Sequence, residues 1–412
     1  MTSIDWLPPQ LPEGWRVARV IDHVRLVNGY PFDSSLFTAD QGVPLVRIRD
    51  LGASRTEVCF AGDPVPGAEI DHGDVLVGMD GDFNVARWAG GRALLNQRVC
   101  CLTPHPSLDP AFLAFFLPTP LKVINDLTGS TTVKHLSSFD ILKVRFPLPP
   151  RDVQGRISRF LESVTGDIDH LLAIKQGVLD LLEEKRRAVI ATAVTRGLDP
   201  KATLRDSGVP WLGKIPAHWQ TERARWLFRE RDVRSETGEE ELLTVSHLTG
   251  VTPRSQKDVN MFEAETNEGY KLCEPGDLVI NTLWAWMGAM GTAPVRGIVS
   301  PAYNVYKPSA RLVPAYVDLL ARVPVFAAEV KRYSKGVWSS RLRLYPEGLF
   351  EVHLPVPSSD EQQAIVDHIT RETEKLDAVR DATERTIELL KERRSALVAA
   401  AVTGQIDVRT AA

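Results

Sequence analysis

Apolar residues change their spacing along this chain of 412 residues. After residue 151 they recur at alternating steps of about three and four residues, which is the spacing of a heptad seam on a long helix. The first seam comprises Ile157, Leu161, Val164, Ile168, Leu171, Val178, Leu182 and Val189. A second seam comprises Ile365, Ile369, Leu376, Val379, Leu390 and Leu397. The pattern predicts long helices at 151–199 and 359–404, both with polar interruptions.

The segments before the two helices contain short apolar runs broken by glycine and proline, which is typical of strands and turns. Residues 43–51 alternate between apolar residues and arginine, so we expect Arg47 and Arg49 on the solvent face of a strand. Residues 109–117 predict a buried helix with Asp109 as its N-cap and proline at its first position.

These patterns divide the chain into successive segments. A mixed α/β globule at 1–150 precedes the first helix, and a second globule at 215–358 precedes the second helix. A linker at 200–214 connects the first helix to the second globule, and a tail at 405–412 ends the chain. The sequence therefore predicts an α/β protein with two globules and two spacer helices.

An internal repeat links the two halves. The stretch DLLEEKRRAVIATAVTRGLD at 180–199 is similar to ELLKERRSALVAAAVTGQID at 388–407. The same offset of about 208 residues holds without a gap back to FPLPPRD and LPVPSSD, with about a third of the positions identical. This self-similarity indicates a tandem duplication of a unit of about 200 residues. The helices share more sequence than the globules, so we expect a common role for the helices and different versions of one role for the globules.

The order globule, helix, globule, helix restricts how the helices can pair. If the two seams face each other, the second helix must run back towards the first globule, so the pair is an antiparallel coiled coil with pseudo-two-fold symmetry. A helix of 40 residues is about 60 Å long. Two globules held a fixed distance apart suit a target in two parts. If that target is DNA, a spacer of this length would separate its two parts by one to two helical turns of about 34 Å each.

The repeated motifs resemble the specificity subunit of type I restriction–modification systems. The resemblance rests on FPLPPRDVQGRI and LPVPSSDEQQAI before the helices and on the two repeated helix ends. GSTTVKHLSSFDILKVRFPLPP, DFNVARWAGGRALLNQRV and VSPAYNVYKP are similar to parts of its target-recognition domains. The resemblance covers essentially the whole chain.

The resemblance implies a recognition subunit that is not itself an enzyme. Each globule would be a target-recognition domain that binds one half of a bipartite sequence in double-stranded DNA. The helices would space the halves and bind two modification subunits, which use S-adenosylmethionine to methylate adenine, and restriction subunits are a further partner in such systems. The chain itself would bind no cofactor.

Basic, amide and hydroxyl side chains contact phosphates and base edges. In the first globule the candidate DNA-binding residues are Arg47, Arg49, Asn84, Arg87, Ser130, Thr131, Thr132, Lys134 and His135. In the second globule they are Lys335, Ser339, Ser340, Arg341 and Arg343. Weaker candidates are Asn96, Gln97, Arg98, Ser300, Tyr303 and Asn304. Each has a structural alternative, because serine and threonine also cap helices and arginines also lie on ordinary solvent faces.

Aromatic residues occur among these candidates. Trp284 and Trp286 alternate as strand residues do, so we expect at least one of them in the core. The stretch KRYSKGVWSSRLR combines basic and aromatic residues without an acid, which by itself suits a DNA contact or a solvated basic loop equally well. The resemblance favours the DNA contact.

Composition narrows the remaining function classes. The net charge of −4 means that any basic DNA-binding surface is local or shared with a partner. The start has no signal-peptide pattern, no apolar run is long enough for a membrane span, and cysteines are few, so we expect a reduced, cytoplasmic protein. No histidine or cysteine spacing suits a metal, and Gly208–Ile215 lacks the serine or threonine of a phosphate loop.

Two other function classes remain open from the residues alone. One is a coiled-coil scaffold whose globules bind proteins, which salt-dependent DNA binding would separate from a DNA-binding subunit. The other is an enzyme in its own right, which would methylate or cleave DNA as an isolated chain.

Overall fold

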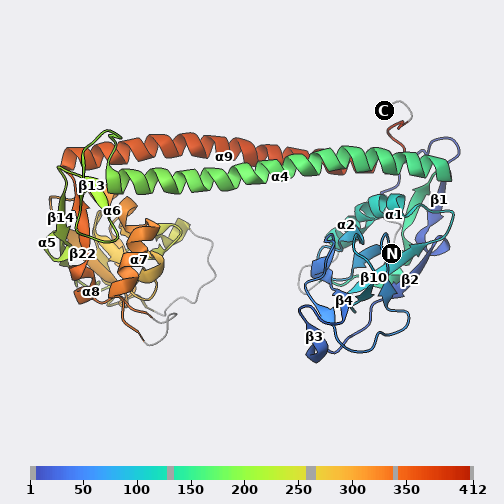
Figure 1. Ribbon diagram of the computed structural model, residues 1–412, viewed down its shortest axis with the longest axis horizontal. Helices are drawn as coiled ribbons and strands as arrows, with labels where there is room; N and C mark the ends of the chain where they lie inside the picture. The colour runs from blue at the N-terminus through green and yellow to red at the C-terminus, as the bar shows by residue number, and fades with distance from the viewer. Residues whose placement is uncertain (1–5, 128–133, 257–265, 337–341, 409–412) are drawn as a thin grey trace. The chain divides into compact units, whose positions relative to one another are not determined.

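A computed structural model describes residues 6–127, 134–256, 266–336 and 342–408. The chain forms two compact units. Unit 1 comprises Met1–Lys175 and Arg385–Ala412, and unit 2 comprises Gln176–Glu384. Each unit therefore contains one globule and a part of each long helix. In Figure 1 the globule of unit 1 is blue to cyan, and the globule of unit 2 is mainly yellow to orange.

The globule of unit 1 is built on a four-stranded antiparallel sheet in the order β2-β10-β7-β8. Its strands are β2 (Val24–Asn28), β10 (Val99–Pro104), β7 (Val75–Gly78) and β8 (Val85–Arg87). All of β7 and most of β10 are buried. Continuous apolar runs such as these suit inner strands that are covered on both faces.

A second sheet and a strand pair complete the strands of unit 1. The second sheet has the order β3-β5-β4-β9-β6. Its strands are β3 (Phe37–Thr38), β5 (Cys59–Phe60), β4 (Val43–Val46), β9 (Ala93–Leu95) and β6 (Glu69–Ile70). The pair is β1 (Arg16–Arg19) with β11 (Arg145–Leu148), and β11 leads into the first long helix. Short 3-10 helices are η1 (Val20–Asp22), η2 (Ser34–Leu36) and η3 (Ile48–Asp50).

Three short helices cover unit 1, namely α1 (Pro110–Phe116), α2 (Pro118–Leu127) and α3 (Ser138–Lys143). The predicted cap of α1 is confirmed, because Asp109 Oδ1 accepts hydrogen bonds from the backbone N–H groups of Ala111 and Phe112, both at 3.0 Å. In Figure 1, α1 and α2 lie between the long helix α4 (Arg151–Arg196) and the strands of unit 1. Together they bury the apolar face of the sheet.

Unit 2 repeats this plan. Its four-stranded sheet has the order β15-β22-β19-β20, and its remaining strands form four pairs. The strands are β12 (Leu204–Asp206), β13 (Lys214–Pro216), β14 (Gln220–Arg223), β15 (Phe228–Glu230), β16 (Leu243–Ser246), β17 (Gly250–Pro253), β18 (Lys271–Cys273), β19 (Leu278–Ile280), β20 (Met290–Thr292), β21 (Gly297–Val299), β22 (Asn304–Pro308) and β23 (His353–Val356). The helices are α5 (Ala224–Leu227), η4 (Arg254–Gln256), η5 (Ala285–Met287), α6 (Pro314–Ala321), α7 (Pro324–Tyr333), α8 (Pro346–Glu351) and α9 (Ser359–Val402).

Corresponding elements of the two units follow the same order. The sheet β2-β10-β7-β8 corresponds to β15-β22-β19-β20, and the pair β1-β11 corresponds to β14-β23. The helices α1 and α2 correspond to α6 and α7, and α4 corresponds to α9. This correspondence confirms the predicted fold class, an α/β protein with an internal duplication whose globules are joined by long helices.

The long helices pack against each other in both units. In unit 1, Ile157 and Leu161 near the start of α4 share a core with Ala401 and Val402 at the end of α9. In unit 2, Ala193 and Val194 at the end of α4 share a core with Ile365 and Ile369 near the start of α9. In each unit the two helical segments therefore run antiparallel, as expected.

Two positions of the predicted seams are wrong. Leu171 and Val379 are exposed. Threonines occupy buried positions instead, and Thr165 and Thr373 each donate a hydroxyl hydrogen bond to the carbonyl four residues earlier, at 2.7 and 2.8 Å. This local hydrogen bond satisfies the hydroxyl, so a buried threonine escapes the cost of an unpaired polar group.

Part of the predicted linker is packed into unit 2. Strand β12 pairs with β13, and Leu212 belongs to the core of the unit. The indole N–H of Trp211 donates to the carbonyl of His353 at 3.1 Å, as that of Trp6 donates to the carbonyl of Arg145 at 3.0 Å in unit 1. In each globule, a tryptophan of the leading segment is thus bonded to the first residue of the last strand, Arg145 of β11 or His353 of β23. The segment boundaries stay predictions.

Candidate nucleic-acid interface

The loop after β7 contains a carboxylate that joins three segments of unit 1. Asp80 lies 2.9 Å from Arg98 Nη1 and 2.7 Å from His135 Nδ1. The side chains of Arg98 and His135 are both more than half exposed. The arrangement presents a guanidinium and an imidazole to solvent beside a shared carboxylate. It brings the predicted residue His135 together with Arg98, a weaker candidate in the sequence.

Lys134 is linked to the loop after β7 through Asn125 on α2. Its ammonium group donates to the carbonyl and to the side-chain oxygen of Asn125, both at 2.8 Å. The amide of Asn125 in turn donates to the carbonyl of Gly81. These contacts tie the loop after β7 to α2, so they give Lys134 a structural role beside any contact with phosphate.

Asn84 lies just before the edge strand β8, and Arg87 is the last residue of that strand. Asn84 is exposed, and its carbonyl accepts from the backbone N–H of Gly78 at 2.8 Å. Arg87 Nη1 lies 2.9 Å from Glu162 Oε1 on α4. It lines a groove of about 560 Å³ that β8, α1, α2, α4 and α9 form within unit 1. Arg87 is therefore held against the long helix, whereas Asp80 and its partners lie in the loops beyond β7.

The prediction that Arg47 and Arg49 lie on one face of a strand is wrong. Strand β4 ends at Val46, and the chain turns into η3 with Arg47 as its N-cap residue. The cause is Asp50, whose carboxylate accepts from the backbone N–H of Arg47 at 2.8 Å and from that of Glu57 at 3.1 Å. A buried carboxylate that satisfies two backbone donors stabilises this turn over an extended strand.

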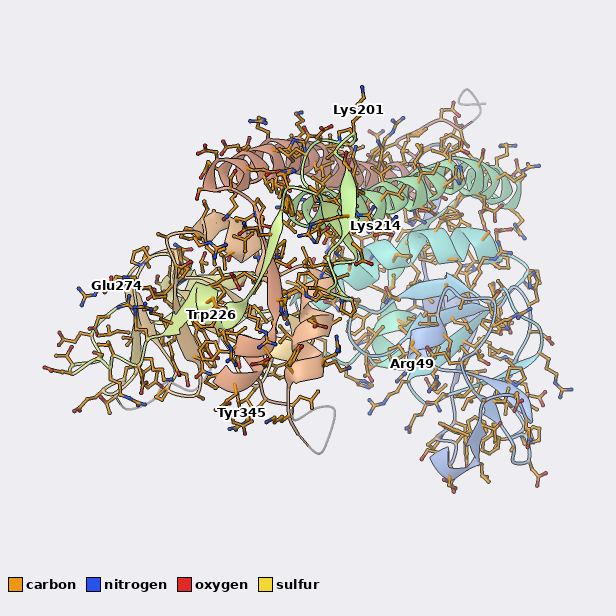
Figure 2. The ribbon with its side chains drawn as sticks, turned by 60° about the vertical axis from the view of Figure 1, so that its left-hand side comes forward. Arg49, Lys201, Lys214, Trp226, Glu274 and Tyr345 are labelled. Carbon is orange, nitrogen blue, oxygen red and sulfur yellow. The ribbon has the colours of Figure 1, made fainter. Side chains whose placement is uncertain are left out.

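The two arginines have different surroundings. The Arg47 side chain is 19% exposed and lies 2.8 Å from Glu57 and 3.5 Å from Asp50. The Arg49 side chain is 64% exposed and lies 3.6 Å from Glu57. Figure 2 shows Arg49 on the part of unit 1 that is remote from α4. Arg49 is thus accessible to a ligand, while Arg47 mainly bridges two acidic residues.

Six predicted DNA-binding residues lie outside the described residues. They are Ser130, Thr131, Thr132, Ser339, Ser340 and Arg341. Their roles stay predictions.

Lys335 and Arg343 face each other in unit 2. Their backbones are joined by two hydrogen bonds, each 2.9 Å long, that form an antiparallel bridge. The backbone N–H of the next residue, Leu344, donates to the carbonyl of Thr282 at 3.1 Å. This bond attaches the bridge to the loop after β19, so two predicted basic residues lie beside the loop that corresponds to the Asp80 loop of unit 1.

The loop after β19 contains two tryptophans that are not strand residues. Strand β19 ends at Ile280, and the tryptophans flank or occupy η5. Asn281 causes the turn, because its side chain accepts from the backbone N–H of Leu283 at 3.3 Å and donates to the Tyr303 hydroxyl at 3.0 Å. The expectation that one tryptophan is in the core is wrong, since Trp284 is half-exposed and Trp286 is only partly buried.

The indole rings of Trp284 and Trp286 are stacked nearly parallel to each other. Their ring centroids are 6.4 Å apart with an interplanar angle of 17°. Lys331 Nζ lies 5.8 Å from the centroid of the Trp286 ring, within the range of a cation–π contact. An exposed aromatic face next to cations is suited to sugar and base edges as well as to apolar partners.

Other exposed aromatic residues of unit 2 were not singled out in the sequence. Trp226 on α5 and Tyr345 at the N-cap of α8 are both substantially exposed. Figure 2 shows Tyr345 on the part of unit 2 remote from the long helices, whereas Lys201 lies beside the helices. Because Tyr345 follows Leu344 directly, it is close to the loop after β19. In the sequence each is a single aromatic residue with no more than one charged neighbour, which is too common a pattern to single out a site.

Polar side chains behind this loop are paired with one another. Lys271 is buried, with its ammonium group 3.4 Å from both Asp232 and the side chain of Asn304. Burial raises the pKa of Tyr303, whose hydroxyl accepts from Asn281. The side chains of the candidates Tyr303 and Asn304 are therefore engaged in hydrogen bonds within unit 2.

The described residues contain no group of three or more histidine, cysteine or acidic residues that could hold a metal ion. Burial raises the pKa of the thiols of Cys100, Cys101 and Cys273 to about 12. These thiols are therefore neutral at physiological pH and serve as core side chains. Within the same described residues, no helix combines the length and apolar character that crossing a membrane requires.

Comparisons with known proteins agree on one family. Residues 12–179 match the family described as "Type I restriction modification DNA specificity domain". The specificity subunit of the type I restriction enzyme EcoBI from Escherichia coli is 28% identical over 410 residues, which span 91% of this chain and 82% of that protein. The EcoKI specificity subunit from Escherichia coli K12 is 23% identical over 210 residues, or 47% of this chain and 45% of that protein.

Solved structures share the fold. A structure described as "Structural basis underlying complex assembly and conformational transition of the type I R-M system" has a TM-score of 0.69 at 17% identity and covers 97% of this chain and 100% of its own. The HsdS subunit from Thermoanaerobacter tengcongensis has a TM-score of 0.50 at 17% identity and covers 98% of this chain and 100% of its own. In sequence the chain is similar to specificity subunits of type I restriction enzymes, and it shares the fold of these solved structures.

Proposed function

We propose that the chain is the sequence-specific DNA-binding subunit of a type I restriction–modification complex, and that each globule recognises one half of a bipartite site. The observation that carries this proposal is the contrast between two matching loops on one repeated scaffold. The loop after β7 places Asp80 beside Arg98 and His135, and the loop after β19 contains Trp284 and lies beside Lys335 and Arg343. The same scaffold with different surface chemistry suits two domains that recognise different sequences.

The chemistry of each loop suits double-stranded DNA. Arginine, lysine and histidine donate to phosphates and to guanine, while the indole face of Trp284 packs against sugars or exposed bases. Figure 2 shows that Arg49 of unit 1 and Tyr345 of unit 2 both lie on parts of their units remote from the long helices. The DNA-binding face of each domain is therefore its loop side, and the helix side remains for other partners.

The long helices are the proposed binding sites for two modification subunits, which would supply S-adenosylmethionine and transfer the methyl group to adenine. Exposed leucines support this assignment, because Leu181 on α4 and Leu389 on α9 occupy the same position of the repeat and both are exposed. Large exposed apolar side chains at matched positions favour a protein partner. The chain itself contributes recognition and no catalytic group. Restriction subunits would join such a complex, and work on chromosomal DNA implies a cytoplasmic location.

Salt-dependent binding tests the proposal. The chain is purified with its modification subunits, and its affinity for duplex DNA is measured between about 50 and 200 mM salt, where several phosphate contacts change the affinity by about 10³-fold or more. Methyl transfer is then measured with the chain, the modification subunits, or both. We expect steep salt dependence and methylation of a defined site only with both components. Salt-independent binding, or methylation by the isolated chain, would contradict the proposal.

A further inference from the structure

Two glutamines at matching positions of the repeat are buried where each long helix begins. Gln154 on α4 is 1% exposed and Gln362 on α9 is 0% exposed. They lie at the repeat offset of about 208 residues. Glutamine is seldom fully buried, because its amide must then find partners inside the protein. Two such residues at one place in both halves suggest a shared task.

Gln154 joins three backbone segments of unit 1. Its Oε1 accepts from the backbone N–H of Asp109, the N-cap residue of α1, at 2.7 Å. Its Nε2 donates to the carbonyls of Ser107 at 3.1 Å and Pro149 at 2.9 Å. One side chain therefore connects the first turn of α4 with the loop before α1 and with the segment that leaves β11.

Gln362 makes the same set of contacts in unit 2. Its Oε1 accepts from the backbone N–H of Val313, the N-cap residue of α6, at 2.8 Å. Its Nε2 donates to the carbonyls of Arg311 at 2.8 Å and Pro357 at 3.0 Å. The neighbouring N-cap differs, because Asp109 is replaced by Val313, yet the glutamine and its three bonds are retained.

We propose that Gln154 and Gln362 are positioning residues that fix the orientation of each recognition domain on its spacer helix, and so help to set the distance accepted between the two half-sites. The inference rests on the proposed recognition of a bipartite site. Apolar contacts such as those of Ile157 also hold domain and helix together. Burial of apolar surface is non-directional, however, whereas hydrogen bonds constrain angle as well as distance.

The required precision follows from DNA geometry. Adding one base pair between half-sites moves one of them by about 3.4 Å and turns it by about 35° around the helix axis. A domain that is fixed in orientation cannot follow that turn without deforming the DNA. A domain that has lost the three hydrogen bonds of its glutamine can rotate on its spacer helix and so accommodate part of the turn. The glutamines therefore affect which spacer is accepted, and leave the bases recognised within each half-site unchanged.

The test uses the complete complex with its modification subunits. The methylated motif of the unaltered protein is first determined, and a plasmid library then presents both half-sites with spacers up to two base pairs shorter or longer. Gln154→Leu and Gln362→Leu remove the amide at similar volume, and Gln154→Met and Gln362→Met serve if a leucine variant does not fold. We expect the unaltered complex to prefer one spacer by about tenfold or more, and each variant to show a preference of only about two- to threefold.

Matched controls separate positioning from simple loss of stability. Gln363→Leu changes the exposed neighbour of Gln362, and Val46→Ala weakens a separate core cluster that contains no residue of α4 or α9. Both controls should keep the spacer preference, even where Val46→Ala lowers the melting temperature as much as the glutamine variants do. Unchanged spacer preference in folded glutamine variants overturns the inference. If the unaltered complex methylates no bipartite motif, the proposed function fails instead.

Discussion

Arg394 on α9 and Asp169 on α4 form a two-pronged ion pair in unit 1, with nitrogen–oxygen distances of 2.8 and 3.2 Å. The matching residues of the repeat, Arg186 and Asp377, form an ion pair of 2.7 Å in unit 2. Each helix therefore contributes one arginine and one aspartate at equivalent positions. Because a shift of the helices would separate both pairs, this duplicated arrangement specifies the antiparallel register.

Removing one of these pairs should cost little stability, while reversing one charge should cost more. The pairs are partly exposed, so Arg394→Ala should lower the free energy of unfolding by about 0.2–1 kcal/mol. Arg394→Asp places two carboxylates together and should lower it further, and adding Asp169→Arg should recover most of the loss. Denaturant unfolding of the unaltered chain, Arg394→Asp, Asp169→Arg and the double variant gives the coupling energy between the two residues. Arg187→Ala, which breaks an exposed pair within α4, is the control. Additive effects in the double variant would argue against a register contact.

Arg47 and Arg49 should separate stability from DNA binding. Arg47→Ala removes a mostly buried partner of Asp50 and Glu57, so it should destabilise the protein by about 1–2 kcal/mol. Arg49→Ala removes an exposed guanidinium and should change stability by less than about 0.5 kcal/mol. Loss of one phosphate contact should reduce the salt slope of DNA binding by about one for Arg49→Ala. Thermal melting measures the stability of the two variants, and salt titrations measure their DNA binding. A larger loss of stability in Arg49→Ala, with the change in salt slope confined to Arg47→Ala, would contradict these positions of the two arginines.

Lys335, Arg343 and Trp284 should contribute to binding by unit 2 in different ways. Lys335→Ala and Arg343→Ala should each weaken binding and reduce the salt slope by about one if they contact phosphates. Trp284→Ala should weaken binding by about 1–3 kcal/mol with little change in the salt slope, because stacking releases no counterion. Lys201→Ala, beside the long helices, is the control and should leave affinity for the site unchanged. Equal effects of all four variants would indicate a general loss of charge or structure.

Acid should destabilise unit 1 through Asp109. Burial raises the pKa of this carboxyl, but hydrogen bonds from the Phe112 backbone and from Arg151 outweigh burial and hold the pKa below its ordinary value. A lowered folded-state pKa stabilises the fold above the unfolded pKa of about 4, and that stabilisation is lost as pH falls through the folded pKa. Asp109→Asn still caps the helix and should flatten the decline in stability below about pH 4. Asp63→Asn makes the same charge change on an exposed loop, and an equal flattening there would exclude a specific role for Asp109.

Exchanging one globule should change one half of the recognised sequence. Replacement of residues 1–150 by the first globule of another specificity subunit keeps α4, α9 and the second globule. The methylated motif of cells carrying the chimera should retain one half-site and its orientation. A change in both halves would show that the globules do not recognise DNA independently.

Local signals in the sequence predicted several parts of the fold correctly. The N-cap of α1 depends on Asp109 and the residues directly after it, so it is visible without knowledge of the rest of the fold. The antiparallel direction of the long helices follows from the order of globules and helices. The repeat offset locates matching elements even where the globules share little sequence, which is why the fold class could be predicted from a single chain.

Contacts between distant residues explain the predictions that were wrong. The turn at Arg47 depends on Asp50 holding the backbone of Glu57, and the turn at Trp284 depends on Asn281 bonding Tyr303 across the sheet. A strand-like alternation gives no sign of such bonds. The seam prediction failed at Leu171 because a heptad count treats threonine as polar, although Thr165 and Thr373 satisfy their own hydroxyls inside the helix pair.

Methylome sequencing of cells with and without this gene, with the modification subunit expressed in both, tests bipartite recognition most directly. We expect a single bipartite motif, two half-sites separated by a spacer of fixed length, to be methylated on adenine only when the gene is present. Persistence of every methylated motif after deletion of the gene would contradict the central claim.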